Sequence, residues 1–240
     1  MKKYLLATTA IVAMAGAASA ADLPLKAAPA YVPVANWTGP YIGAHVGVGR
    51  MNSSCDQNGG YNYYSCGTYT GGVTTSDTGI VGGINAGYDW QDRNFVYGVI
   101  ADWTWTNLKK TRSSSYSTYQ LRTQVDWLAS FRGRAGLAVD NTLVYLTGGV
   151  ALGKVKAGGF GGPTTDFSNV CYGCVDKVKV GWVAGAGVEH KFNKTWSVNF
   201  EALYYDLGRE TASTVYAGTS YVNEYHWEVF VARVGMNYRF

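Results

Sequence analysis

The chain has 240 residues and a formal net charge of +4, and Lys2 and Lys3 in its first residues supply two of its positive charges. So small a charge argues against a nucleic-acid-binding protein, which usually presents a strongly basic surface. Glycine, tyrosine and tryptophan are abundant (31, 19 and 8 residues), and 15% of the residues are charged. This composition disfavours helices and favours β-strands. No apolar run after residue 20 is long enough for a membrane-spanning helix, so a membrane protein of this sequence must cross with strands.

The first 20 residues predict a secretory signal peptide. Lys2 and Lys3 precede an apolar stretch from Leu5 to Ala17. Ala18-Ser19-Ala20 then supplies the small residues of a cleavage site. The apolar stretch is short for a spanning helix, which needs about 20 residues. We therefore expect an exported protein whose mature chain begins at Ala21.

The prolines separate an N-terminal segment from the rest of the chain. Four of the five prolines precede residue 41, and the fifth, Pro163, lies in a glycine-rich stretch. Because proline cannot donate a hydrogen bond to a β-ladder, its absence elsewhere is typical of a closed sheet. We expect residues 21–38 to form a Pro/Ala-rich periplasmic segment and residues 39–240 to form a barrel.

Beyond this segment, eight stretches alternate apolar residues with polar or small ones, as β-strands do. In the last stretch, for example, Phe230 and Val234 share one face, and Arg233 and Gly235 share the other. The expected strands are Pro40–Arg50, Thr78–Trp90, Phe95–Thr106, Gln120–Val139, Thr142–Lys156, Lys177–His190, Thr195–Leu207 and Glu224–Phe240.

The connections between these strands alternate in length. Those after the second, fourth and sixth strands are short, and the others are long, at about 51–77, 107–119, 157–176 and 208–223. This alternation is typical of an outer-membrane barrel with short periplasmic turns and long external loops. Aromatic residues near the strand ends fit its interfacial girdles. The sequence therefore predicts an all-β fold, an eight-stranded antiparallel transmembrane β-barrel in the cell outer membrane. The alternative is a soluble barrel with an apolar interior.

The polar faces of the strands would line the lumen of this barrel. Charges in so narrow a space must pair or be hydrated. Because the interior of eight strands is just wide enough for side chains, we expect a packed ion-pair network that plugs the barrel. The alternative is a narrow, gated pore. The predicted lumenal residues are His45, Asp89, Asp102, Arg122, Asp126, Arg132, Arg134, Lys177, Lys179, Glu189, Glu201, Arg233 and Arg239.

All four cysteines fall in predicted external loops, and an exported protein meets an oxidising compartment. We expect the disulfides Cys55–Cys66 and Cys171–Cys174, although four cysteines allow three connectivities. The spacing of Cys171 and Cys174 also matches redox and metal motifs. Since the sequence has no second pair at zinc spacing and no surrounding βαβ pattern, we expect no metal site.

Several stretches resemble a known family: Ala21–Pro24, Trp37–Gly43, Gly181–Glu189, Glu201–Gly208 and the end at Phe240. In these stretches the chain resembles the outer-membrane immunogenic proteins of alphaproteobacteria, which are Gram-negative. This family is often grouped with the opacity-family or OmpA-like β-barrel porins. The resemblance implies an eight-stranded barrel with antigenic surface loops, and in some relatives haemin binding, small-pore activity or adhesion. It also implies that the end of the last strand, with Tyr238 and Phe240, is the signal for the outer-membrane assembly machinery.

Three features bear on partners. His226, between Tyr225 and Trp227, is the candidate contact for haemin, the one cofactor considered. The basic run at 109–112 suits lipopolysaccharide phosphates, with an ordinary solvated loop as the alternative. No arrangement of nucleophile, base and orienting carboxylate supports an enzyme.

We therefore expect a monomeric, non-enzymatic protein of the cell envelope that displays its loops as a surface antigen. The alternatives are a narrow porin for small solutes and a haemin-binding or host-adhesion protein.

Overall fold

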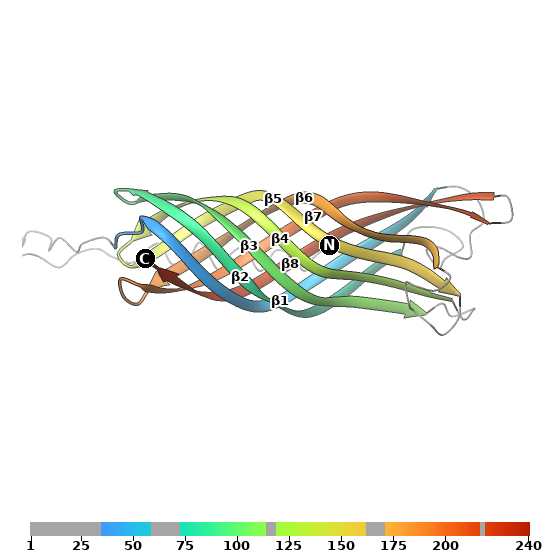
Figure 1. The fold of residues 1–240 in the computed structure, drawn as a ribbon, viewed down its shortest axis with the longest axis horizontal. Coiled ribbons are helices and arrows are strands. Elements are labelled where there is room, and N and C mark those ends of the chain that lie inside the picture. Colours follow the sequence, from blue (N-terminus) through green and yellow to red (C-terminus); the bar gives the residue numbers. More distant parts are fainter. Residues whose placement is uncertain (1–34, 59–72, 114–118, 162–170, 217–218) are drawn as a thin grey trace, which may run out of the picture. The chain divides into compact units, whose positions relative to one another are not determined.

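The computed structural model describes residues 35–58, 73–113, 119–161, 171–216 and 219–240. Eight antiparallel strands follow one another around a closed barrel, and β8 pairs with β1 to complete it (Figure 1). This confirms the predicted fold. Among the described residues, no helix has the length and apolar character needed to cross a membrane. The strands are β1 (Gly39–Asn58), β2 (Val73–Asp92), β3 (Phe95–Ser113), β4 (Tyr119–Val139), β5 (Thr142–Gly161), β6 (Cys171–Lys191), β7 (Trp196–Tyr216) and β8 (Thr219–Arg239).

Near the short turns, the strands place apolar side chains outside. On β5, Val144 and Leu146 are exposed, whereas Tyr145 between them is buried in the interior. The same alternation runs around the barrel, and a soluble protein would bury such side chains. The band of large exposed apolar side chains includes Ile42, Ile84, Phe131, Val150, Val180, Phe200, Val234 and Met236.

Aromatic side chains border this band at both ends. On the side of the short turns, the ring centroids of Trp90 and Tyr97 lie 5.7 Å apart, and Tyr238 packs against Phe240 at 5.0 Å. At the other border, Trp103 stacks on Trp127 at 4.3 Å, and Trp182 lies 5.5 Å from Tyr204. Such aromatic rings sit where the hydrocarbon meets the lipid headgroups. We call the second group the outer aromatic belt.

The turns set the orientation of the barrel. Arg93 and Asp140 adopt positive φ angles (54° and 52°) in the tight turns after β2 and β4, as two-residue hairpins require. These turns and the C-terminal end lie at the same end of the barrel (Figure 1). Because short turns face the periplasm in such barrels, the opposite end faces outward.

The strands continue far beyond the outer aromatic belt, which the sequence analysis did not anticipate. Much of the expected first loop is strand, in β1 up to Asn58 and in β2 from Val73. The loop expected at 208–223 is reduced to residues 217–218 between β7 and β8. These segments resemble loops in sequence because they are rich in Ser, Thr and Asn. Their inward faces supply the apolar residues that keep them in the sheet.

In this outer part the barrel divides into two sheets. The β2–β3 ladder ends at Val81–Thr106, and the β6–β7 ladder ends at Trp182–Asp206. The other ladders continue outward. Strands β7, β8, β1 and β2 therefore form one sheet, here called outer sheet A, and β3 to β6 form outer sheet B. We call the two lines of separation the β2–β3 seam and the β6–β7 seam.

Candidate functional site: the filled barrel interior

Nearest the periplasm, four charged side chains form a closed ring across the interior, here called the lower ring. Arg134 pairs with Asp89 and, at 2.9 Å, with Glu189. Arg239 pairs with the same two carboxylates at 2.8 and 3.0 Å. All four side chains are almost fully buried, and their charges sum to zero. Each carboxylate thus faces two guanidinium groups, which is the condition under which buried charges are tolerated.

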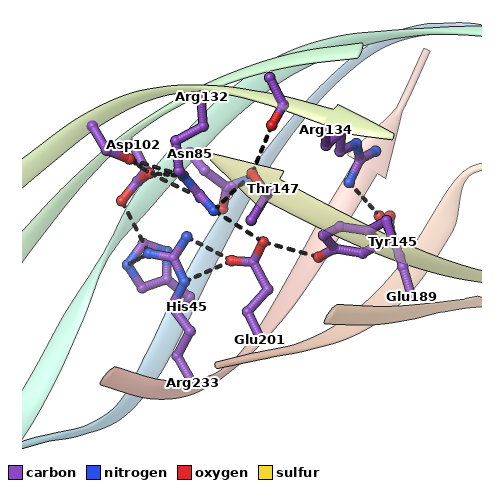
Figure 2. A network of polar contacts seen from close by, with 12 residues as sticks. His45, Asn85, Asp102, Arg132, Arg134, Tyr145, Thr147, Glu189, Glu201 and Arg233 are labelled. Atoms are coloured by element: carbon purple, nitrogen blue, oxygen red, sulfur yellow. Dashed lines mark hydrogen bonds and ion pairs between the residues drawn. The ribbon is translucent and has the colours of Figure 1, made fainter. Parts of the chain in front are cut away.

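A second ring of the same design, the upper ring, lies closer to the outer aromatic belt. Arg132 is 3.0 Å from Asp102 and 3.4 Å from Glu201. Arg233 is 3.0 Å from Asp102 and 2.6 Å from Glu201. The Nε2 atom of His45 lies 3.1 Å from Arg233 (Figure 2). This ring is also neutral, so neither ring leaves an excess charge in the lumen.

Neutral side chains join the two rings. Tyr145 donates its hydroxyl hydrogen bond to Glu201 (2.9 Å), and its ring lies beside Arg134, at 5.1 Å (Figure 2). Asn237 donates to Glu189 and accepts from Asn85, both at 3.0 Å. The network is therefore continuous from one ring to the other.

The interior becomes apolar beyond the upper ring. Leu128 and Leu203 begin this region, and Trp227, Met51 and Val155 continue it between the two outer sheets; all five are fully buried. The indole of Trp227 donates a hydrogen bond to Thr123, which joins outer sheet A to outer sheet B. This apolar cluster differs from the polar lumen that the alternation of residues predicts. Several of its members, such as Met51, Leu108 and Ala157, lie in stretches that were expected to be loops.

The periplasmic mouth is covered by the segment before β1. Trp37 is fully buried and packs on Val96, Leu143 and Tyr145. Its carbonyl accepts a hydrogen bond from Arg239, and its amide donates to Gln91. Residues 35–38, which the sequence analysis assigned to a linker, thus form a stopper against the lower ring. Residues 1–34 lie outside the described residues, so the signal peptide remains a prediction.

The structure therefore brings nine of the thirteen predicted lumenal residues into the interior: the eight members of the two rings and His45. The other four lie elsewhere, and two physical features explain why.

A β-bulge reverses the outer end of β4. The ladder with β5 shifts between Val125 and Trp127. Below this point Leu128 and Arg132 face inward, whereas above it Thr123 and Val125 do so. Because a bulge adds one residue, every side chain beyond it changes face. Arg122 and Asp126 were predicted in the lumen, and this was wrong: they lie on the outward face.

Lys177 and Lys179 were also predicted in the lumenal network, but they bridge the β6–β7 seam. Both pair with Glu210 on β7, at 2.6 and 2.7 Å. These hydrogen bonds lower the pKa of Glu210 below its ordinary value. Across the β2–β3 seam, Lys110 lies 4.0 Å from Asp77. At each seam, lysine of outer sheet B therefore pairs with a carboxylate of outer sheet A: one lysine at the β2–β3 seam and two at the β6–β7 seam.

His226 lies on the outward face of β8, where its Nε2 atom is 2.9 Å from Asp206. Tyr225 and Trp227, expected to flank a haemin at this position, are buried in the interior instead. Since neighbours in a strand point to opposite sides, the expected aromatic cluster around this histidine does not form.

Cys55 and Cys174 are not free thiols. Cys66 lies outside the described residues, so the pairings Cys55–Cys66 and Cys171–Cys174 remain predictions. Among the described residues, no group of His, Cys, Asp and Glu is suited to hold a metal ion.

Comparison with known proteins agrees with this geometry. Residues 8–240 match the model of the "Outer membrane protein beta-barrel domain" family. The chain belongs to this family of outer-membrane β-barrels. It is 34% identical to the "31 kDa outer-membrane immunogenic protein" of Brucella melitensis, over the full length of both chains. It is 27% identical to the "25 kDa outer-membrane immunogenic protein" of the same species, over 100% of this chain and 99% of that one.

Among solved structures, the outer membrane protein OprG of Pseudomonas aeruginosa superimposes with a TM-score of 0.51 at 13% identity, over 86% of this chain and 98% of that one. This likeness concerns the fold. The family match and the Brucella relatives place the chain in the cell outer membrane and confirm the resemblance drawn from the sequence.

Proposed function

We propose that this protein is a closed structural barrel of the outer membrane that displays its outer connections at the cell surface. The observation that supports this is the filled interior: a stopper, two neutral charge rings and an apolar cluster follow one another along the barrel axis. An open pore needs a continuous path of water, and an eight-stranded barrel has little room beside such side chains. The immunogenic relatives in Brucella agree with a surface position.

The narrow porin is the alternative, and single-channel recording separates the two. The refolded protein would first be tested for the gel shift on boiling that marks a folded barrel. The same sample would then be placed in a planar bilayer. We expect a gel shift and no discrete current steps. Reproducible steps from shifted protein would overturn the closed barrel and support a narrow pore.

A further inference from the structure

A group of cations lies on the outward face of outer sheet B, next to the outer aromatic belt. Lys154 on β5 is the ladder partner of Trp127 on β4, which stacks on Trp103 in the belt. Because the belt marks the border of the hydrocarbon, side chains just beyond it lie among the lipid headgroups. The group, here called the basic face, consists of Lys109, Arg122, Lys154 and Lys156.

The basic face points toward the bilayer and away from the interior. Lys154 and Lys156 alternate along β5 with Val155 and Ala157, which are fully buried between the two outer sheets. Gln124 on β4 pairs with Lys156 on one side and with Lys109 on the other. Adjacent strands lie about 4.8 Å apart, so these two lysines are separated by about 10 Å. That spacing lets neighbouring cations contact one multiply phosphorylated headgroup.

Two carboxylates hold the lysines without neutralising the face. Asp126 lies 2.9 Å from Lys156, and Asp176 pairs with Lys154. All four side chains keep roughly a quarter to a half of their surface exposed. Exposed pairs of this kind are weak, so an incoming anion can compete for the ammonium groups. Within the described part of this face, four cations stand against two carboxylates, so its formal charge is positive.

The opposite side of the barrel has the reverse character. At the same level, the side chains that the structure describes on the outward face of outer sheet A include three carboxylates, Asp206, Glu224 and Glu228, and two arginines, Arg50 and Arg209. This group attracts a phosphate less than the basic face does. The difference gives the barrel one side suited to phosphorylated lipid and one side that is not.

We propose that the basic face binds the phosphates of lipopolysaccharide in the outer leaflet. This interaction goes beyond the closed structural role, because it would orient the barrel relative to specific lipids around it. The binding is electrostatic, with the lysine ammonium groups and the Arg122 guanidinium donating hydrogen bonds to phosphate oxygens.

The test compares two variants in lipid nanodiscs titrated with purified lipopolysaccharide. One carries Arg122→Gln, Lys154→Gln and Lys156→Gln. The control carries Arg50→Gln and Arg209→Gln on outer sheet A. Each cation near a charged lipid surface contributes about fivefold in affinity, so we expect the triple variant to bind about 100-fold more weakly. The control should retain the wild-type affinity. Lipopolysaccharide without its phosphates should bind the wild-type protein as weakly as intact lipopolysaccharide binds the triple variant.

Three results would overturn the proposal. The triple variant could retain wild-type affinity, the control could lose as much as the triple variant, or the wild-type protein could bind dephosphorylated lipopolysaccharide equally well. The last comparison needs no substitution, so it can overturn the proposal even where the triple variant does not give the gel shift of a folded barrel.

Discussion

Toward the periplasm the barrel interior is filled by charged side chains, whereas beyond the outer aromatic belt it is filled by apolar ones. The lower and upper rings pair four arginines with four carboxylates. The outer cluster instead packs Met51, Leu128, Val155 and Trp227 between two sheets. The same eight strands thus carry two opposite patterns along their length.

The surroundings of each region explain the difference. Where lipid surrounds the barrel, apolar side chains gain nothing by turning inward, and the outward face must be apolar. Where water surrounds it, apolar side chains gain by leaving the surface, as in a soluble β-sandwich. The transmembrane barrel therefore describes the part of the chain within the membrane, and the two outer sheets share with the alternative soluble barrel only an apolar interior.

The largest effect is expected in the lower ring. Arg134→Gln leaves Asp89 and Glu189 with half of their positive partners in a buried site. Removing one partner of a buried ion pair costs about 3–5 kcal/mol, so we expect a loss near 4 kcal/mol in the free energy of unfolding. Urea titration in lipid vesicles measures it. Arg122→Gln, on the outward face of the same strand, is the matched control and should cost less than about 0.5 kcal/mol. Equal losses in the two variants would contradict the ring.

A somewhat smaller effect is expected where the apolar region begins. Leu128→Ala removes a fully buried side chain, and such changes cost about 2–5 kcal/mol through lost burial and an unfilled cavity. We expect a loss of about 3 kcal/mol in the free energy of unfolding, measured by the same urea titration. Leu128→Met keeps the volume and should cost less than about 1.5 kcal/mol. If Leu128→Ala left the free energy of unfolding unchanged while Leu128→Met lowered it, this region would not be packed as described.

The smallest effect is expected at the β6–β7 seam. The pKa of Glu210 is lowered in the folded protein by its hydrogen bonds with Lys177 and Lys179. The contribution of this carboxylate is therefore present above its unfolded pKa and is lost as the pH falls through the lowered value. Because the Glu210 carboxylate is partly exposed, we expect it to contribute less than about 1 kcal/mol to the stability of the seam.

Hydrogen exchange of the outer part of β7 measures this contribution. The protection factor, which is the exchange rate corrected for the intrinsic pH dependence of amide exchange, should be smaller at pH 3 than at pH 7 in the wild-type protein. Glu210→Gln should remove that dependence, and an unchanged pH response in this variant would assign it to another group.

Much of this structure could be predicted from the alternation of residue types. Alternation placed Asp89, Arg132, Glu201 and Arg233 in the interior, because strands without irregularities have a fixed period. It failed at Arg122 and Asp126, since one bulge inverts all later positions and leaves no clear mark in the sequence. It also failed to separate the lumen from the seams, because Lys177 faces inward by period but lies beyond the end of a ladder.

Two parts of the site had weaker signals. The stopper residue Trp37 stands alone before the first strand, and nothing in its neighbours shows that it turns back over the barrel mouth. Tyr145 lies on an inward face. Its ring can take the position that joins the two charge rings because it lies over Gly187, which has no side chain. A Cβ at Gly187 would lie 2.6 Å from the Tyr145 ring. Such a contact between strands β5 and β6 is visible only once their register is known.

The two seams have a mechanical consequence. On the periplasmic side of the seams, the strands form a closed barrel without free edges, so neighbouring strands resist being pulled apart. Above them, the connection between β1 and β2 and that between β7 and β8 both belong to outer sheet A. The connections of β3 with β4 and of β5 with β6 belong to outer sheet B. The surface connections are thus divided between two sheets that can move relative to each other. An antibody that binds residues of both sheets would restrict this motion at the seams.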